Sequence, residues 1–119
     1  MVLVVDDNRD AAESLGVFLK LCDLPVVVAF DGYEAIEAME KVRPQAVLLD
    51  ISMPGLSGLQ VATWVRSKPW GCAVRLIAMT SRDQLEARQM TADAGFDRHI
   101  VKPVDPGEVL AELKYLRTG

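Results

Sequence analysis

The segment AVLLDISMPGLSG, residues 46–58, decides the fold because it contains a strand, a loop and the start of a helix in one stretch. Its first four residues are apolar, as in a strand that is covered on both faces of a sheet. Asp50 follows this strand at once, and a proline and two glycines then shape the loop. Ser57 and Gln60 have capping-box spacing, which marks the start of a helix. The segment therefore predicts a strand–loop–helix unit with a carboxylate at the carboxyl end of the strand.

The same unit recurs along the chain. Four further short apolar runs, mostly Val, Leu and Ile, alternate with stretches of helical period. A (βα)5 chain predicts an α/β fold, in which a doubly wound, five-stranded parallel sheet carries helices on both faces. The predicted strands are residues 2–5, 26–29, 46–49, 74–78 and 99–101.

Most of the predicted helices carry an apolar stripe and a recognisable start. Capping-box spacing also occurs at Asp31/Glu34, Ser81/Gln84 and Asp105/Glu108, and Pro106 stands at a first helical position. The fourth stripe is the weakest and most polar, so we expect this helix to shift more cheaply than its neighbours. The stripes are Leu15, Phe18, Leu19 and Cys22; Ala35, Ala38, Met39 and Val42; Gly58, Val61, Ala62 and Val65; Ala87, Met90 and Ala94; and Val109, Leu113 and Leu116.

Polar residues follow four of the five predicted strands. Ligands of such sheets bind outside the carboxyl ends of the strands, so these side chains are expected to converge. Three converging carboxylates repel one another unless a cation joins them, and Mg²⁺ works with few carboxylates, several waters and a phosphate. A lysine and a threonine beside that ion indicate phosphoryl chemistry. The converging residues are Asp6 and Asp7, Asp50, Thr80 and Ser81, and Lys102.

A structural reading competes at each of these positions. A single Asp after a strand is most often a helix cap or a turn residue, and Asp6-Asp7-Asn8 alone fits such a turn. Lys102 before Pro103 fits a solvated loop. The functional reading prevails because four strand ends carry the parts of one reaction.

Composition narrows the class of protein. The 119 residues contain 13 Lys and Arg against 17 Asp and Glu, and a net charge of −4 argues against nucleic acid or an anionic membrane as a direct partner. Cys22 and Cys72 lack metal-site spacing and are expected to be reduced thiols. No apolar run is long enough to span a membrane and no signal peptide precedes the first strand. We therefore expect one cytoplasmic domain over residues 1–119.

At the residues of the expected site the sequence closely resembles the receiver domains of response regulators and hybrid histidine kinases, from residue 2 to about residue 116. The resemblance implies a flavodoxin-like strand order of 2-1-3-4-5. It also implies a two-component phosphorelay domain that catalyses its own phosphotransfer and dephosphorylation and is otherwise not an enzyme. The motifs that carry it are VVDD at 4–7, LLDISMPG at 48–55 with Gly58, MTS at 79–81 and VKP at 101–103.

The resemblance assigns a role to each residue of these motifs. Asp50 is the implied phosphoacceptor, with a phosphohistidine of a histidine kinase or a histidine phosphotransfer protein as donor. Asp7 is the implied direct ligand of Mg²⁺ or Mn²⁺, assisted by Asp6, Asp50 and the backbone carbonyl of Ser52. Thr80 and Lys102 would hold phosphoryl oxygens, and the Lys102–Pro103 bond would be cis.

Further implied roles concern how the phosphorylated state is passed on to other domains or proteins. Thr80 and His99, at the place of an aromatic residue in receivers, form the implied switch, which alters the surface of helix 4, strand 5 and helix 5. Ser52 and Arg82 stand where receivers tune the lifetime of the aspartyl phosphate. The stretch before VKP is similar to receivers of hybrid sensor kinases, so we expect a piece of a larger protein with a kinase or output domain, rather than a stand-alone receiver.

Three other classes of protein compete with this interpretation. A phosphatase of the haloacid-dehalogenase type would need an acid two residues after Asp50, where Ser52 stands. A flavodoxin-like cofactor carrier would need a phosphate-binding loop where Asp6 and Asp7 stand. A phosphorylation-independent receiver-like interaction module remains open, although such modules usually lack one of the key residues.

Overall fold

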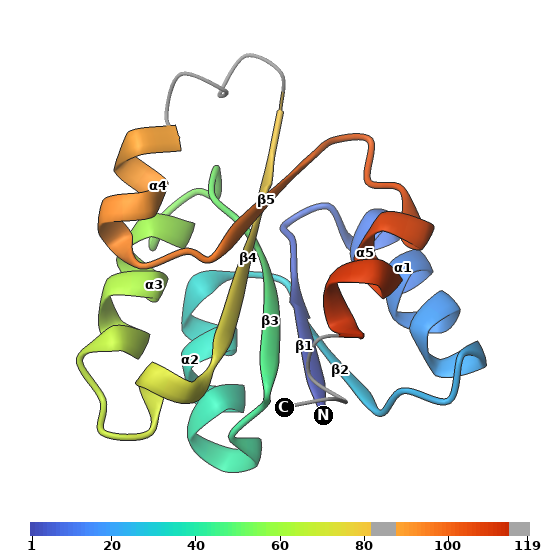
Figure 1. Ribbon diagram of the computed structural model, residues 1–119, viewed down its shortest axis with the longest axis horizontal. Coiled ribbons are helices and arrows are strands. Elements are labelled where there is room, and N and C mark those ends of the chain that lie inside the picture. Colours follow the sequence, from blue (N-terminus) through green and yellow to red (C-terminus); the bar gives the residue numbers. More distant parts are fainter. Residues whose placement is uncertain (82–87, 115–119) are drawn as a thin grey trace.

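A parallel sheet in the order β2-β1-β3-β4-β5 forms the centre of the molecule (Figure 1). The computed structural model describes residues 1–81 and 88–114, except the side chains of residues 88 and 89. The strand order and the parallel pairing confirm the predicted fold class. The strands are β1 (Val2–Val5), β2 (Val26–Ala29), β3 (Ala46–Asp50), β4 (Arg75–Thr80) and β5 (Arg98–Val101).

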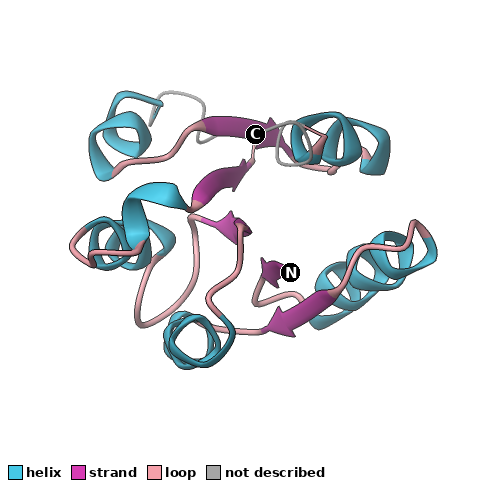
Figure 2. Cartoon of the chain, turned by 60° about the horizontal axis from the view of Figure 1, so that its bottom comes forward, coloured by secondary structure: helices cyan, strands magenta, loops and turns pink. Residues whose placement is uncertain are grey.

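The helices lie in two layers, one on each face of the sheet. Helices α1 and α5 cover one face, and α2, α3 and α4 cover the other (Figures 1 and 2). The helices of the described residues are α1 (Arg9–Leu21), α2 (Gly32–Val42), α3 (Gly58–Arg66), α4 (Arg88–Ala94) and α5 (Pro106–Leu113), with a short 3-10 helix, η1, at Gly71–Ala73.

The sheet faces divide the core into two buried apolar clusters. Leu49, Ala78 and Val61 belong to the cluster under α2 and α3, whereas Leu48 and Ile77 belong to the cluster under α1 and α5. Neighbouring residues of β3 therefore serve opposite faces, as alternation along a strand requires. This double burial explains why the strands read as continuous apolar runs.

Four boundaries, in three of the predicted strands, were off by one or two residues. Asp50 and Thr80, expected just after their strands, are the last residues of β3 and β4. At the start of β4, Val74 instead ends the 3-10 turn, and β5 begins at Arg98. Ladder hydrogen bonds reach the polar residues, whereas the apolar pattern stops before them.

Helix starts follow the predicted caps with local differences. Ser57 and Gln60 form a complete capping box. Asp31 caps the N–H of Glu34, but the Glu34 carboxylate accepts from Phe30. Asp105 accepts from Gly107 rather than pairing reciprocally with Glu108. Gln84 lies outside the described residues.

Little of the described part of helix α4 is apolar and buried. Met90 is exposed and Ala94 is half-buried, whereas Thr91 is fully buried. Ala87 of the predicted stripe, like Leu116 of the last, lies outside the described residues. The weak apolar commitment predicted for this helix therefore holds for the side chains that can be described.

Two further expectations concern the cysteines and the membrane. Cys22 and Cys72 are both free, the first half-buried at the end of α1 and the second exposed in η1. In residues 1–81 and 88–114, no helix combines the length and apolarity that a membrane crossing needs.

Candidate functional site

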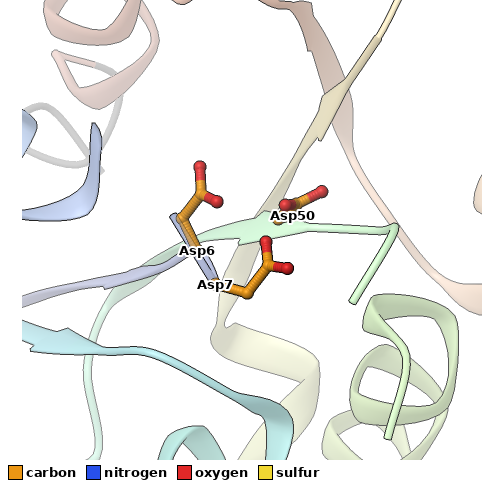
Figure 3. A group of neighbouring side chains, drawn as sticks. All are labelled: Asp6, Asp7 and Asp50. Carbon is orange, nitrogen blue, oxygen red and sulfur yellow. The ribbon is translucent and has the colours of Figure 1, made fainter. Parts of the chain in front are cut away.

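Three carboxylates meet at the carboxyl end of the sheet. Asp6 and Asp7 follow β1, and Asp50 ends β3; one oxygen of each lies within 4.8 Å of the other two (Figure 3). Asp6 and Asp50 are buried, whereas Asp7 is exposed. The sequence predicted this convergence from strand ends alone.

The register of the sheet explains why the carboxylates of Asp6 and Asp50 lie close together. Strands β1 and β3 are parallel neighbours, and Val5 pairs with Leu49. The next residue on each strand is an aspartate, so Asp6 and Asp50 leave the sheet side by side. Backbone N–H groups then fix both carboxylates: Asn8 donates to Oδ1 of Asp6 and Ser52 donates to Oδ1 of Asp50, each at 3.0 Å.

Lys102 neutralises part of the negative charge of the three carboxylates. Its Nζ lies 3.0 Å from Oδ2 of Asp6 and 3.0 Å from Oδ2 of Asp50, so one ammonium joins the two buried carboxylates. The residue follows β5, and its peptide bond to Pro103 is cis. With one cation against three acids, the site carries an excess of negative charge.

Burial changes the protonation of the central pair. Burial raises the pKa of Asp50 to about 6, and the negative charge of Asp6 adds to the rise. The N–H of Ser52 and the ammonium of Lys102 act in the opposite direction, but they do not outweigh burial. Burial alone would lower the pKa of Lys102, but its hydrogen bonds to Asp50 and Asp6 outweigh burial and raise it. Lys102 thus stays charged at neutral pH, while Asp50 loses its last protons only above pH 6.

Thr80 ends β4 with its hydroxyl buried. Its Oγ1 has no hydrogen-bond partner among the described residues, and the residue is only 1% exposed. An unpaired buried hydroxyl costs about 1–3 kcal/mol. Such a group is suited to a ligand oxygen that is brought to the end of the sheet.

The remaining predicted site residues lie around this centre or beyond it. Ser52 is exposed in the β3–α3 loop and lines the acidic pocket. His99 on β5 is half-buried and hydrogen-bonds through Nε2 to the hydroxyl of Thr91. Arg82 lies outside the described residues.

The acidic pocket has a volume of about 320 Å³ and includes Asn8, which was expected only in a turn. Asn8 caps α1 and borders the pocket. Ser81, expected among the converging residues, also borders it. The position of Asn8 next to Asp7 was the available signal.

The donor set fits a hard divalent cation. All three acids offer carboxylate oxygens to one small volume, and oxygen is the donor that Mg²⁺ and Mn²⁺ prefer. Lys102 at the rim offers a positive charge to an incoming anion. The arrangement can therefore hold a divalent cation and an anion next to the Asp50 carboxylate.

Comparison with known proteins gives a consistent result. The model of the family described as "Response regulator receiver domain" matches residues 2–114. Response regulator MprA of Mycobacterium ulcerans is 39% identical over 115 residues, which cover 97% of this chain and 49% of that protein. The chain thus spans about half the length of the curated relatives it matches.

Solved structures agree with the fold. Chemotaxis protein CheY4 of Vibrio cholerae superposes with a TM-score of 0.89 at 26% identity, over 96% of this chain and 95% of that chain. The receiver domain of the Francisella response regulator 1452 gives a TM-score of 0.87 at 25% identity, over 99% and 98% of the two chains.

Proposed function

The chain belongs to the response regulator receiver domain family, and we propose that it accepts a phosphoryl group on Asp50 in a two-component phosphorelay. The observation that carries the proposal is the bridge of Lys102 between two buried carboxylates in an acidic pocket. A structural cap needs neither a partner lysine nor neighbouring acids. Residues 1–119 would act as one such domain.

The reaction is a phosphoryl transfer between two side chains. A carboxylate oxygen of Asp50 attacks the phosphorus of a phosphohistidine on a histidine kinase or histidine phosphotransfer protein. A P–O bond forms, the P–N bond breaks, and the imidazole nitrogen leaves with the electron pair and takes a proton from water. Such a transfer requires mainly an in-line nucleophile and neutralised oxygens.

Lys102 and Thr80 would bind the transferred group. The Lys102 ammonium, now 3.0 Å from Asp50, is within reach of a phosphoryl oxygen on that carboxylate. The buried hydroxyl of Thr80 could donate to a second oxygen and would then gain the partner it lacks. Both residues therefore favour the phosphorylated form.

Asp6, Asp7 and Asp50, with the backbone carbonyl of Ser52, would hold a Mg²⁺ or Mn²⁺ ion. Such an ion would supply positive charge that neutralises phosphoryl oxygens and favours the ionised form of Asp50. The excess of acids over lysine in the pocket supports this assignment.

The output and the setting complete the proposal. Phosphorylation would change Thr80 and His99 and hence the surface of α4, β5 and α5, to which an effector, an output domain or a kinase domain of the same protein would respond. Ser52 and Arg82 would tune the lifetime of the aspartyl phosphate. A cytoplasmic location and a parent protein of the hybrid-kinase type belong to the same proposal.

The test uses a small acyl phosphate donor with and without Mg²⁺. Wild-type protein should gain one phosphoryl group by intact-mass measurement, only with the metal, and Asp50→Asn should gain none. Equal labelling of both proteins would refute the phosphoacceptor role. A wild type that stays unlabelled both by this donor and by a phosphorylated histidine phosphotransfer protein would favour a phosphorylation-independent interaction module.

A further inference from the structure

A cavity of about 420 Å³ lies between α1 and the connection from β5 to α5, on the face of the sheet that these helices cover (Figure 1). Small-molecule sites have volumes of roughly 300–1,000 Å³, so the cavity is large enough for a ligand. Apolar side chains make up most of its lining, among them Leu15 of α1, Met79 of β4 and Val104 of the connection.

Short side chains leave this space open. Ala11 and Ala12 line it from α1, and Pro103 and Pro106 line it on either side of Val104. An alanine side chain extends only one carbon from the helix, and a proline ring closes on its own backbone nitrogen. Neither can fill the space between two elements. Ala11 is exposed, so the cavity opens to solvent near the start of α1.

One wall of the cavity is charged. Asp6, Asn8 and Lys102 line both this cavity and the acidic pocket, so the two spaces adjoin at these side chains. Asp6 is only 3% exposed, and its two oxygens accept from the N–H of Asn8 and the ammonium of Lys102, each at 3.0 Å. A carboxylate can accept about four hydrogen bonds, so Asp6 can accept further ones from a ligand.

The charge at this wall favours a cationic ligand. Lys102 is shared between Asp6 and Asp50, and Asp7 places a third carboxylate within 4.8 Å of both. One ammonium against three carboxylates leaves an excess of negative charge, which attracts a cation and repels an anion. A neutral polar group would gain only an ordinary hydrogen bond there.

We propose that this cavity binds a small primary amine with an apolar body. The ammonium group of the ligand donates to Asp6, with charge-assisted hydrogen bonds. The body of the ligand lies between α1 and the β5–α5 connection, where the apolar lining removes it from water. Binding of this amine does not require phosphorylation of Asp50.

The first experiment compares three ligands of similar shape by NMR titration of tag-free, nitrogen-15-labelled protein at neutral pH, with divalent metal removed. Phenethylamine carries a positive charge, 2-phenylethanol is neutral, and phenylacetate carries a negative charge. Phenethylamine should bind the wild type with a dissociation constant of about 1 mM and shift the amides of Ala12, Leu15 and Val104. The alcohol should bind about ten-fold more weakly, and phenylacetate should not bind measurably.

A second experiment blocks the cavity with a side chain. A phenyl ring at the exposed position of Ala11 can fill the cavity from its rim, so Ala11→Phe should weaken phenethylamine binding at least ten-fold. Val17→Phe is the matched control, because Val17 is on the same helix, is 57% exposed and is not among the residues that line the cavity. This control should bind phenethylamine as the wild type does.

A third experiment removes the charge of the wall. Asp6→Asn keeps the shape of the side chain, so it should lower the affinity for phenethylamine about ten-fold and leave the affinity for 2-phenylethanol unchanged. Should this variant not fold, the comparison of ligands on the wild type tests the same preference.

Each comparison has a result that would overturn the proposal. Equal affinities of the wild type for phenethylamine and 2-phenylethanol, or measurable binding of phenylacetate, would refute recognition of an ammonium group. Undiminished binding to Ala11→Phe would place the ligand outside this cavity, and a wild type without saturable binding of phenethylamine would refute the site. All of these measurements use unphosphorylated protein without metal, so they stand whether or not Asp50 accepts a phosphoryl group.

Discussion

Asp50 differs from an ordinary strand-end aspartate in its surroundings. It is 3% exposed, one oxygen accepts from the backbone of Ser52, and the other faces Lys102. A solvated cap would have an ordinary pKa, whereas burial raises that of Asp50 to about 6. The residue thus keeps a costly buried negative charge that a bound cation could compensate.

The raised pKa has a consequence for stability. The unfolded chain loses this proton near pH 3.8 and the folded chain near pH 6, so the folded state binds more protons in between. Without metal, the free energy of unfolding should therefore fall as the pH rises through this window, by at most about 3 kcal/mol.

The variant Asp50→Asn has no carboxyl to titrate at this position, so its free energy of unfolding should not fall in this way as the pH rises. Urea unfolding without Mg²⁺ should show it more stable than wild type by about 1–3 kcal/mol at pH 8, with the difference vanishing near pH 4. A constant difference from pH 4 to pH 8 would show that folding does not raise the pKa of the Asp50 carboxyl.

At the residue scale, the sequence predicted side chains that follow strands but missed those that act across the fold. Asp6, Asp7, Asp50 and Lys102 were found because parallel strands end at one edge. Arg66 was not singled out, because its partners Gly95 and Asp97 lie about 30 residues away and depend on how α3 packs against α4. Thr91 was missed because no apolar pattern marks a buried polar residue.

At the scale of elements, the β3–α3 connection positions Asp50 through a close backbone approach. A Cβ on Gly58 would lie 2.4 Å from the carbonyl oxygen of Asp50 and 2.6 Å from Cα of Ile51. Gly58→Ala should therefore displace the loop, lower stability by about 2–4 kcal/mol and slow phosphorylation of Asp50.

Gly107→Ala is the matched control. Its Cβ would meet only Oδ1 of Asp105, at 3.3 Å, on the exposed first turn of α5. Thermal unfolding and labelling should both stay near wild type. If Gly58→Ala behaves like Gly107→Ala, the close approach does not position Asp50.

Arg66 connects α3, β4 and the turn after α4. Arg66→Met should lower the free energy of unfolding by about 2–4 kcal/mol, because three partly buried carbonyls and Asp97 lose a charged donor. Lys41→Met breaks only the exposed ion pair with Glu37 and should change the free energy of unfolding by less than about 0.5 kcal/mol. Equal effects in urea unfolding would contradict the structural role of Arg66.

The predicted elements were correct in kind, and their errors were confined to the ends. Strands β1 and β2 begin and end as predicted, because their apolar runs coincide with the ladder. Strands β3 and β4 extend into polar residues, because hydrogen bonding rather than hydropathy decides where a ladder ends. The composition of the runs could not reveal this.

At the scale of the whole molecule, the alternation of strands and helices determined the layers and the parallel sheet. The strand order came from the resemblance to receivers, since alternation alone permits other orders of a doubly wound sheet. The order places β3 between β1 and β4 and thereby brings Asp50 between the acids after β1 and Thr80.

Metal binding should be visible in the stability of the whole molecule. At pH 8, Mg²⁺ at about 100 times its dissociation constant should stabilise the wild type by about 3 kcal/mol, and chelation should reverse this. Asp7→Asn removes an exposed acid of the pocket and should lose most of the gain. A gain that is equal in both proteins would place the ion elsewhere.

The most direct test of the central claim identifies the residue that carries the phosphoryl group. Protein treated with an acyl phosphate donor and Mg²⁺ is reduced with borohydride, which converts an aspartyl phosphate into homoserine, and its peptides are sequenced by mass spectrometry. We expect homoserine at position 50 in the wild type, and none after treatment without Mg²⁺. Homoserine at position 6 or 7, or at no position while the phosphoryl group is retained, would contradict the phosphoacceptor role of Asp50.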